Sequence, residues 1–209
     1  MPSSVGIIDY GAGNILNVAR AFEKNHVKTE IVTEPGSLKA HSHIVLPGVG
    51  SFDYGMENLH QRNLVGALIK NAHEGVPILG ICLGMQLLAK RGHENGETDG
   101  LGLIRGDIVH LATSPGAEAR HKIPHTGWSP LFWNHGESSP SGSLLGAAYF
   151  NHSYFLSNFA VEDVVATTWL GSLEIPAVVR SGSILATQFH PEKSGEMGLR
   201  FLCEWIESA

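Results

Sequence analysis

The sequence predicts an α/β protein with a mostly parallel central sheet, flanked by helices, and an added antiparallel section. Strand-like and helix-like segments alternate up to residue 90, which is typical of crossover connections on a parallel sheet. Several short strand-like segments follow one another between residues 149 and 189, which is typical of antiparallel strands. We expect residues 1–209 to form one domain, because this length lies within the range of a single α/β unit.

The elements of the first half follow from the spacing of apolar residues. Apolar runs predict strands at residues 5–9, 29–33, 42–46 and 76–81. Apolar residues at helical spacing predict helices at residues 15–24, 53–60, 61–73 and 83–90. Pro47 and the glycines after it should end the third strand, and Gly75 should end the helix before the fourth strand.

Beyond residue 90 the composition changes. Polar, glycine-rich or small residues predict surface loops at 91–100, 112–119 and 134–143. Strand-like patterns occupy residues 103–111, 149–156, 164–170, 177–180 and 184–189. Residues 195–207 have the apolar face of an amphipathic helix.

Composition and charge exclude several classes of protein. A net charge of −6 argues against nucleic-acid binding, which usually requires a basic surface. The N-terminus lacks the pattern of a signal peptide, and no apolar stretch approaches the ~18 residues of a membrane span. The only cysteines, Cys82 and Cys203, are too few for a disulfide framework and fit a reducing compartment. We therefore expect a cytoplasmic protein with no nucleic-acid or membrane partner.

Cys82 lies where the fourth predicted strand meets a helix, between Gly80 and Gly84. This G-x-C-x-G pattern is the cysteine version of a nucleophile elbow, in which small neighbours allow a sharp bend that exposes the side chain. The N–H groups that open a helix favour a thiolate and can donate to an oxyanion. Taken alone, the pattern fits a buried, packed cysteine equally well, since free cysteine is among the most buried residue types.

A nucleophilic cysteine needs a base and a group that orients that base. The segment His190-Pro191-Glu192 offers both, directly after the last predicted strand. If that strand is parallel to the strand before Cys82, the two segments lie at the same edge of the sheet. Residues i and i+2 of an extended chain point the same way, so Glu192 could hold the His190 imidazole in the tautomer that faces the thiol. On its own, the segment would more often be a polar loop.

Two glycine-rich turns also follow predicted strands. Pro47-Gly48-Val49-Gly50 is a stiff loop suited to presenting backbone N–H groups, although on its own the segment would more often be a simple strand-ending turn. Residues 11–14 lack the third glycine of a dinucleotide fingerprint, so no nucleotide site is expected there.

The histidines and Trp128 raise two further hypotheses. The pairs His41/His43 and His121/His125 have no cysteine or carboxylate partner at a ligand spacing that stands out, so no metal is expected. Residues 122–128 combine a rigid proline with His125 and Trp128, which fits either a docking surface or a turn capped by the tryptophan.

Six blocks of sequence resemble the class I glutamine amidotransferases, and among these the glutaminase subunits of imidazole glycerol phosphate synthase. The blocks are I-I-D-Y-G-A-G-N (7–14), L-P-G-V-G-S-F (46–52), L-G-I-C-L-G-M-Q-L-L (79–88), K-I-P-H-T-G-W (122–128), Y-F-N-H-S-Y (149–154) and Q-F-H-P-E-K-S (188–194). They occur in the family's order and span nearly the whole chain. The resemblance implies the family's flavodoxin-like fold and a reaction without a cofactor.

The resemblance also implies a mechanism. Cys82 would attack the carboxamide of L-glutamine to form a γ-glutamyl thioester, with His190 as base and acid and Glu192 behind it; water would then release glutamate. The N–H of Leu83 and an N–H at Val49 or Gly50 would form the oxyanion hole, which in the family depends on a rearrangement of segment 47–50. The residues implied for holding the substrate are Gly50, Gln86, Ser153 and Tyr154.

A partner is implied as well. In the family the glutaminase is nearly silent until a (β/α)8-barrel synthase subunit binds ligand. Ammonia then passes through the barrel, where its nitrogen enters imidazole glycerol phosphate, with aminoimidazole carboxamide ribotide as the other product. Asn14, His125 and Trp128 match family positions at or near this heterodimer interface.

Three departures from the family pattern leave alternatives open. Asn151 replaces a commonly hydrophobic residue, Thr126 replaces a methionine, and Ser51-Phe52-Asp53 replaces Ala-Phe-Gly. The S-F-D form also occurs in paralogues that supply ammonia to enzymes modifying surface-polysaccharide sugars, which is the first alternative. A cysteine hydrolase or redox or chaperone protein of the same shape should lack Gln86, the H-S-Y block and the H-P-E segment. A catalytically inactive binding subunit is disfavoured by the complete triad.

Overall fold

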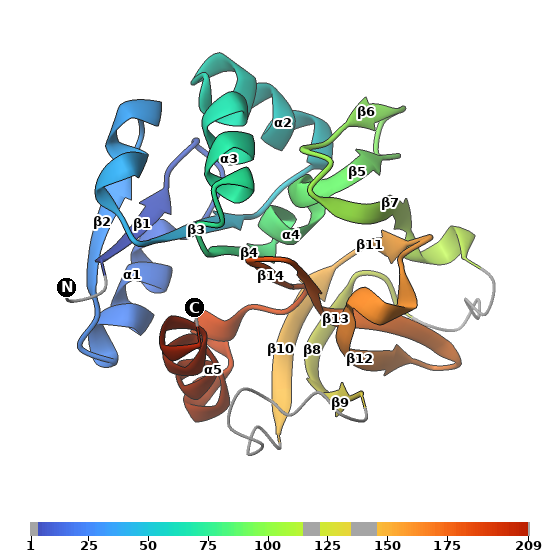
Figure 1. Cartoon of the computed structure of the whole chain (residues 1–209). Coiled ribbons are helices and arrows are strands. Elements are labelled where there is room, and N and C mark those ends of the chain that lie inside the picture. Colours follow the sequence, from blue (N-terminus) through green and yellow to red (C-terminus); the bar gives the residue numbers. More distant parts are fainter. Residues whose placement is uncertain (1–3, 115–121, 135–145, 209) are drawn as a thin grey trace.

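The computed structural model describes residues 4–114, 122–134 and 146–208. Its central sheet has eight strands in the order β2-β1-β3-β4-β14-β13-β12-β9 (Figure 1). The first five pair in parallel, and the last three are antiparallel. The bounds are β2 (Lys28–Val32), β1 (Ser4–Ile8), β3 (His43–Gly48), β4 (Ile78–Cys82), β14 (Ile184–Thr187), β13 (Leu173–Ser181), β12 (Val164–Leu170) and β9 (Phe132–Trp133).

Helices cover both faces of the parallel part of the sheet (Figure 1). One face packs against α1 (Ile15–Lys24) and α5 (Gly195–Glu207), the other against α2 (Phe52–Gln61), α3 (Leu64–His73) and α4 (Leu83–Leu88). Neighbouring residues of a strand enter opposite cores: Ile44 contributes to the core under α2 and α3, and Val45 to the core under α1 and α5. Burial on both faces explains why the inner strands β1, β3 and β4 are mostly apolar, whereas the edge strand β2 carries exposed polar residues.

Two smaller sheets extend the molecule beside the central one. The first pairs β10 (Ala147–His152) with β8 (His125–Pro130). The second has the order β11-β7-β5-β6, with β11 (Tyr154–Ser157), β7 (Ile104–His110), β5 (Ala89–Gly92) and β6 (Thr98–Asp99). Short 3-10 helices lie at Pro35–Ala40, Leu111–Thr113, Val161–Asp163 and Pro191–Lys193. No helix in the described ranges is long and apolar enough to cross a membrane.

Several expected boundaries are wrong. The helix expected at 83–90 ends at Leu88, because the chain from Ala89 is extended and pairs with β7, and part of the loop expected at 91–100 lies in β5 and β6. The single strand expected at 149–156 is two strands, which pair in different sheets on either side of Ser153. In both cases tertiary pairing overrides the local pattern. Residues 115–119 of the loop expected at 112–119 and residues 135–143 of the loop expected at 134–143 lie outside the described residues.

Pro47 does not end the third strand, which continues to Gly48. Pairing of β3 with β1 stops at Val45, whereas pairing with β4 continues to Gly48 opposite Cys82. On the β1 side the strand is therefore an edge at Pro47, where the missing N–H of proline costs no ladder bond.

The strand that leads to His190 runs parallel to the strand that ends at Cys82, since β14 pairs in parallel with β4. The carboxyl ends of β3, β4 and β14 therefore meet at one edge of the sheet. This edge is where ligands bind in open α/β sheets.

Candidate active site

The backbone at Cys82 has the sharp bend expected of a nucleophile elbow. Its φ is 55° and its ψ is −108°, a conformation that non-glycine residues rarely adopt. The bend carries the chain from β4 directly into α4, and Gly84 makes the close approach possible, because a Cβ there would collide with the carbonyl oxygen of Leu46. A Cβ at Gly80 would likewise meet Leu88 and the backbone of Met85. Both glycines are thus needed for the tight packing of the elbow.

The His190 and Glu192 side chains are in direct contact. The Nδ1 atom of His190 lies 2.8 Å from Oε1 of Glu192, and both side chains are almost fully buried. Since a carboxylate only accepts, Nδ1 carries the hydrogen of this bond. The other ring nitrogen, Nε2, is left for Cys82, whose side chain is close enough to raise the pKa of His190. The structure therefore brings the three residues together in the order Cys82, His190, Glu192.

Electrostatics favour a charged imidazole at His190. Burial lowers its pKa, but the hydrogen bonds and negative charges of Cys82 and Glu192 outweigh burial and raise the pKa to about 10. At neutral pH the arrangement therefore favours an imidazolium at His190, which can donate toward Cys82.

Backbone bonds fix the position of His190. Its N–H donates to the carbonyl oxygen of Tyr149 at 2.9 Å. The hydroxyl of Ser194 donates to the His190 carbonyl at 2.7 Å and accepts from the Tyr149 N–H at 2.9 Å. His190 is thus held against β10, and later residues of this strand line the cavity described below.

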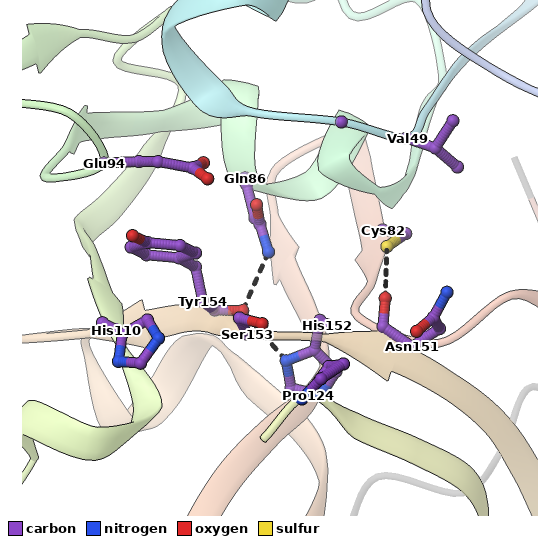
Figure 2. Close-up of a pocket in the computed structure, with 11 residues that line it drawn as sticks. Val49, Cys82, Gln86, Glu94, His110, Pro124, Asn151, His152, Ser153 and Tyr154 are labelled. Atoms are coloured by element: carbon purple, nitrogen blue, oxygen red, sulfur yellow. Dashed lines mark hydrogen bonds between the residues drawn. The ribbon is translucent and has the colours of Figure 1, made fainter.

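A cavity of about 340 Å³ opens in front of Cys82 (Figure 2). Its lining residues are Val49, Gly50, Cys82, Gln86, Glu94, His110, Pro124, Asn151, His152, Ser153 and Tyr154. The lining thus includes every residue expected to hold the substrate, and two of those expected at the oxyanion hole. Leu83 is buried at the start of α4 and is not part of the lining, nor are His190 and Glu192.

A buried chain of hydrogen bonds leads from β8 to the cavity wall. Ser129 Oγ lies 2.8 Å from Nε2 of His125, whose Nδ1 lies 3.1 Å from Nε2 of His152, whose Nδ1 lies 2.9 Å from the Tyr154 carbonyl oxygen. The carbonyl can only accept, so His152 donates from Nδ1, and two neutral rings then require His125 to donate to His152 and Ser129 to donate to His125. Burial lowers the pKa of both histidines, which supports the neutral forms.

The expected interface residues lie in different environments. Asn14 is exposed and caps α1, accepting from the N–H of Asn17, and the Trp128 side chain is 58% exposed. His125 is buried and stacks on Phe150, with ring centroids 4.8 Å apart. The structure does not bring the His125 side chain to the surface of β8.

Two departures from the family pattern are neighbours in space. Thr126 and Asn151 are paired across β8 and β10, and Thr126 Oγ1 donates to Asn151 Oδ1 at 3.0 Å. The backbone carbonyl of Asn151 lies 4.0 Å from Cys82 Sγ (Figure 2). The polar pair therefore stands on the strand that faces the thiol.

Several residues of the site were not predicted from the sequence, among them Glu94, His110 and Gln188. Glu94 and His110 line the cavity, but Glu94 lies in a segment that was expected to be a plain surface loop. Gln188 is fully buried beside Cys82 and lies two residues before His190. Its place in the Q-F-H-P-E-K-S block was the one available signal.

The histidine pairs considered as metal ligands do not form a metal site in the described residues. In residues 4–114, 122–134 and 146–208, no group of three or more metal-binding side chains occurs. His41 approaches Glu30 at 3.8 Å, and His43 packs edge-on against Trp205. His121 lies outside the described residues.

The sequence matches the family model described as glutamine amidotransferase class-I over residues 6–205. The imidazole glycerol phosphate synthase subunit HisH of Geobacillus sp. (strain WCH70) is 43% identical over 201 residues, covering 95% of this chain and 93% of the relative. The subunit of the same description from Streptococcus mutans is 39% identical over 201 residues, covering 96% and 97%.

Solved structures show the same fold. A crystal structure described as a glutamine amidotransferase has a TM-score of 0.74 at 20% identity, covering 96% of this chain and 98% of the other. The structure of PurLQS from Thermotoga maritima contains a chain with a TM-score of 0.74 at 20% identity, covering 100% and 99%. The predicted fold class is confirmed. This chain belongs to the class I glutamine amidotransferases and, within them, to the HisH subunits of imidazole glycerol phosphate synthase.

Proposed function

We propose that this protein hydrolyses L-glutamine to glutamate and ammonia with Cys82, His190 and Glu192, and passes the ammonia to a synthase subunit of histidine biosynthesis. Family membership gives the enzyme class, a glutamine amidotransferase subunit of imidazole glycerol phosphate synthase. The observation that carries the mechanism is the buried His190–Glu192 pair, whose imidazole is coupled to a strained cysteine that lines a polar cavity.

In the first half of the reaction, the Cys82 thiolate attacks the side-chain carbonyl carbon of glutamine. The carbonyl electrons move to oxygen, and the resulting oxyanion is held by the N–H of Leu83 and an N–H at Val49 or Gly50. When the carbonyl re-forms, the C–N bond breaks and the imidazolium of His190 protonates the leaving nitrogen, so that ammonia departs. The products of this half are a γ-glutamyl thioester and a neutral His190.

In the second half, water attacks the thioester. Neutral His190 removes a proton from the water through Nε2, and Glu192 stabilises the imidazolium that forms at Nδ1. Collapse of the second tetrahedral intermediate breaks the C–S bond, releases glutamate and restores the ion pair of thiolate and imidazolium. Because Nδ1 remains bonded to Glu192, Nε2 stays aimed at the reacting atoms in both halves.

The substrate is held by the polar wall opposite Cys82. Gln86 donates from Nε2 to the Tyr154 carbonyl at 2.9 Å, which turns its Oε1 away from Tyr154 as an acceptor for the substrate (Figure 2). Gly50 and Ser153 line the same cavity and supply backbone groups. Glu94 is the acidic side chain of the lining, and we assign to it the α-ammonium group of glutamine.

The Glu94 carboxylate is pre-positioned for this role. Its Oε2 accepts from the backbone N–H of Phe52 at 2.9 Å, at the start of α2. Burial raises the pKa of Glu94, which leaves it a strong acceptor once a cation arrives. One carboxylate oxygen is thus fixed by the protein while the group faces the cavity.

The ammonia is delivered to a (β/α)8-barrel subunit. The relatives are named as subunits of imidazole glycerol phosphate synthase, so a second subunit is expected for this chain. Asn14 and Trp128 offer exposed polar and aromatic surface for it, whereas the buried His125 supports β8 from within.

Co-purification with the barrel subunit, followed by a glutaminase assay with and without the barrel's ribonucleotide ligand, tests the proposal. We expect release of glutamate to rise strongly when both partner and ligand are present. No stimulation by this pair would contradict the histidine-pathway assignment and favour a sugar-modifying acceptor. A Cys82→Ala protein that still released glutamate would contradict the chemistry itself.

A further inference from the structure

The buried amide of Gln188 lies between two residues of the site. Its Nε2 is 4.0 Å from Cys82 Sγ, and its Oε1 is 3.3 Å from Nε2 of Gln86. Gln188 is fully buried, and its backbone N–H donates to the Ala177 carbonyl oxygen at 3.0 Å. A fully buried amide is costly unless its polar atoms have partners, so its position between these two groups has an energetic basis.

The Tyr154 carbonyl oxygen determines how the side-chain amides of Gln86 and Gln188 are oriented. The Tyr154 carbonyl oxygen can only accept, so Gln86 must point its Nε2 toward it. The second hydrogen of that nitrogen then points to Gln188, which must present Oε1. The Gln188 Nε2 is consequently the end that faces Cys82. These hydrogen bonds therefore allow only one of the two possible orientations of the Gln188 side-chain amide.

The backbone carbonyl of Asn151, at the same distance from Cys82 Sγ, has the opposite effect on the thiol. The Asn151 carbonyl oxygen is also 4.0 Å from Cys82 Sγ, and it can accept a hydrogen only from the neutral thiol. The Gln188 N–H donates to sulfur and therefore favours the thiolate. A donor and an acceptor thus lie at equal distances from the Cys82 sulfur.

We propose that Gln188 is a positioning residue that couples the nucleophile to the substrate wall. Through Nε2 it favours the thiolate of Cys82, and through Oε1 it fixes the amide of Gln86 in the orientation that presents an acceptor to glutamine. The parallel register that places Thr187 opposite Ile81 puts Gln188 beside Cys82, so the sheet itself sets this contact. The inference rests on the proposed function in assigning Cys82 and Gln86 to the reaction.

The test measures the reactivity of the Cys82 thiol independently of glutamine turnover. In a Cys203→Ser background, the rate at which Cys82 displaces iodide from iodoacetamide is measured against pH for Gln188 and for Gln188→Met. Methionine has a similar length but neither the N–H nor the oxygen. We expect the midpoint of the pH–rate profile to rise by about one pH unit in Gln188→Met, as for loss of one hydrogen bond to a charged group. The KM for glutamine should rise at least about threefold, since Gln86 loses an acceptor.

Two further variants are needed: Gln188→Glu separates the two contacts of the amide, and Thr187→Val is the matched control. Glutamate keeps an oxygen for Gln86 but places a second oxygen toward Cys82, so the alkylation midpoint should rise while KM changes less than in Gln188→Met. Thr187 is equally buried, and its hydroxyl donates to the Phe189 carbonyl; Thr187→Val should leave the midpoint unchanged.

An unchanged midpoint in both Gln188 variants, in folded protein with a reactive wild-type Cys82, would overturn the inference. An equal shift in Thr187→Val would overturn it as well, because the effect would then be a general consequence of altering this strand. An unreactive wild-type Cys82 would instead count against the proposed function.

Discussion

The His190 Nδ1 atom is bonded to Glu192 Oε1 at 2.8 Å, with both side chains almost fully removed from solvent. The bond leaves Nε2 as the ring nitrogen available to Cys82 and determines the tautomer of the neutral imidazole. Removing the negative charge behind the ring should therefore affect catalysis more than folding.

Glu192→Gln is expected to lower kcat for glutaminase activity by about 10²-fold or more, because the neutral amide no longer stabilises the imidazolium. Release of glutamate in the presence of the activating partner measures the effect. The matched control is Glu162→Gln, an exposed carboxylate 2.9 Å from Arg105, which should keep wild-type activity. Equal losses in the two variants would contradict the role of Glu192.

Glu94→Gln is expected to raise the KM for glutamine by about 10- to 100-fold, the effect of losing a hydrogen bond between charged groups. The kcat value should change less, since Glu94 lies at the far side of the cavity from the reacting carbon. Steady-state kinetics measures both. Glu97→Gln alters an exposed carboxylate three residues along the chain, 3.1 Å from Arg91, and should leave KM unchanged. A KM that stays at the wild-type value in Glu94→Gln would remove Glu94 from the substrate site.

The buried His152 gives the fold a dependence on pH. Burial and the charges that His125 and His190 carry when protonated lower the pKa of His152 to about 3, against the raising effect of its bond to the Tyr154 carbonyl. Unfolding frees the imidazole to bind a proton near pH 6.5. The stabilisation is therefore fully present above pH 6.5 and is lost as the pH falls below it.

His152→Asn should weaken this dependence, because asparagine can keep a donor toward Tyr154 but does not titrate. Between pH 7 and pH 5, the wild type should lose about 2 kcal/mol more of its free energy of unfolding than the variant does. Urea denaturation at the two pH values measures the difference. His93→Asn, at an exposed position, should behave as the wild type. If His152→Asn lost stability as steeply as the wild type, His152 would not be the buried neutral group described.

Gly84→Ala should destabilise the fold by about 3 kcal/mol or more, since the added Cβ meets the Leu46 carbonyl oxygen and must move the elbow. Gly66→Ala is the matched control within α3, where no atom lies within 4 Å of the added Cβ. That change should raise the free energy of unfolding by about 0.5–1 kcal/mol through helix propensity. Thermal or chemical unfolding compares the two, and equal effects would contradict the close contact at Gly84.

Much of the fold follows from local pattern. Helices α1 and α5 and strand β12 have the bounds that apolar spacing predicted: each helix buries one face against the sheet, and β12 is a strand of the sheet with buried residues on both faces. The pattern failed at Ala89, where helix α4 gives way to a strand of the β11-β7-β5-β6 sheet, and at Ser153, where the chain leaves one sheet and joins another. Nothing in the spacing of side chains marks such a change, because each segment remains extended or apolar, and only the partner strand decides.

Some residues of the candidate site can likewise be predicted from the sequence, and others cannot. Cys82 and the 190–192 segment stand out because strand ends, glycines and a proline surround them. Glu94 and Gln188 do not, since an acidic residue in a polar loop and a glutamine in a strand have many ordinary explanations. Their assignment depends on contacts between residues far apart in sequence, such as the bond from Gln86 to Gln188.

Mass spectrometry of the enzyme quenched in acid during turnover of glutamine tests the central claim most directly. The peptide that contains Cys82 should carry a γ-glutamyl group that hydroxylamine removes, the Cys203 peptide should not, and Cys82→Ala should release no glutamate. Steady release of glutamate by Cys82→Ala, with no adduct on Cys82 in the wild type, would contradict it.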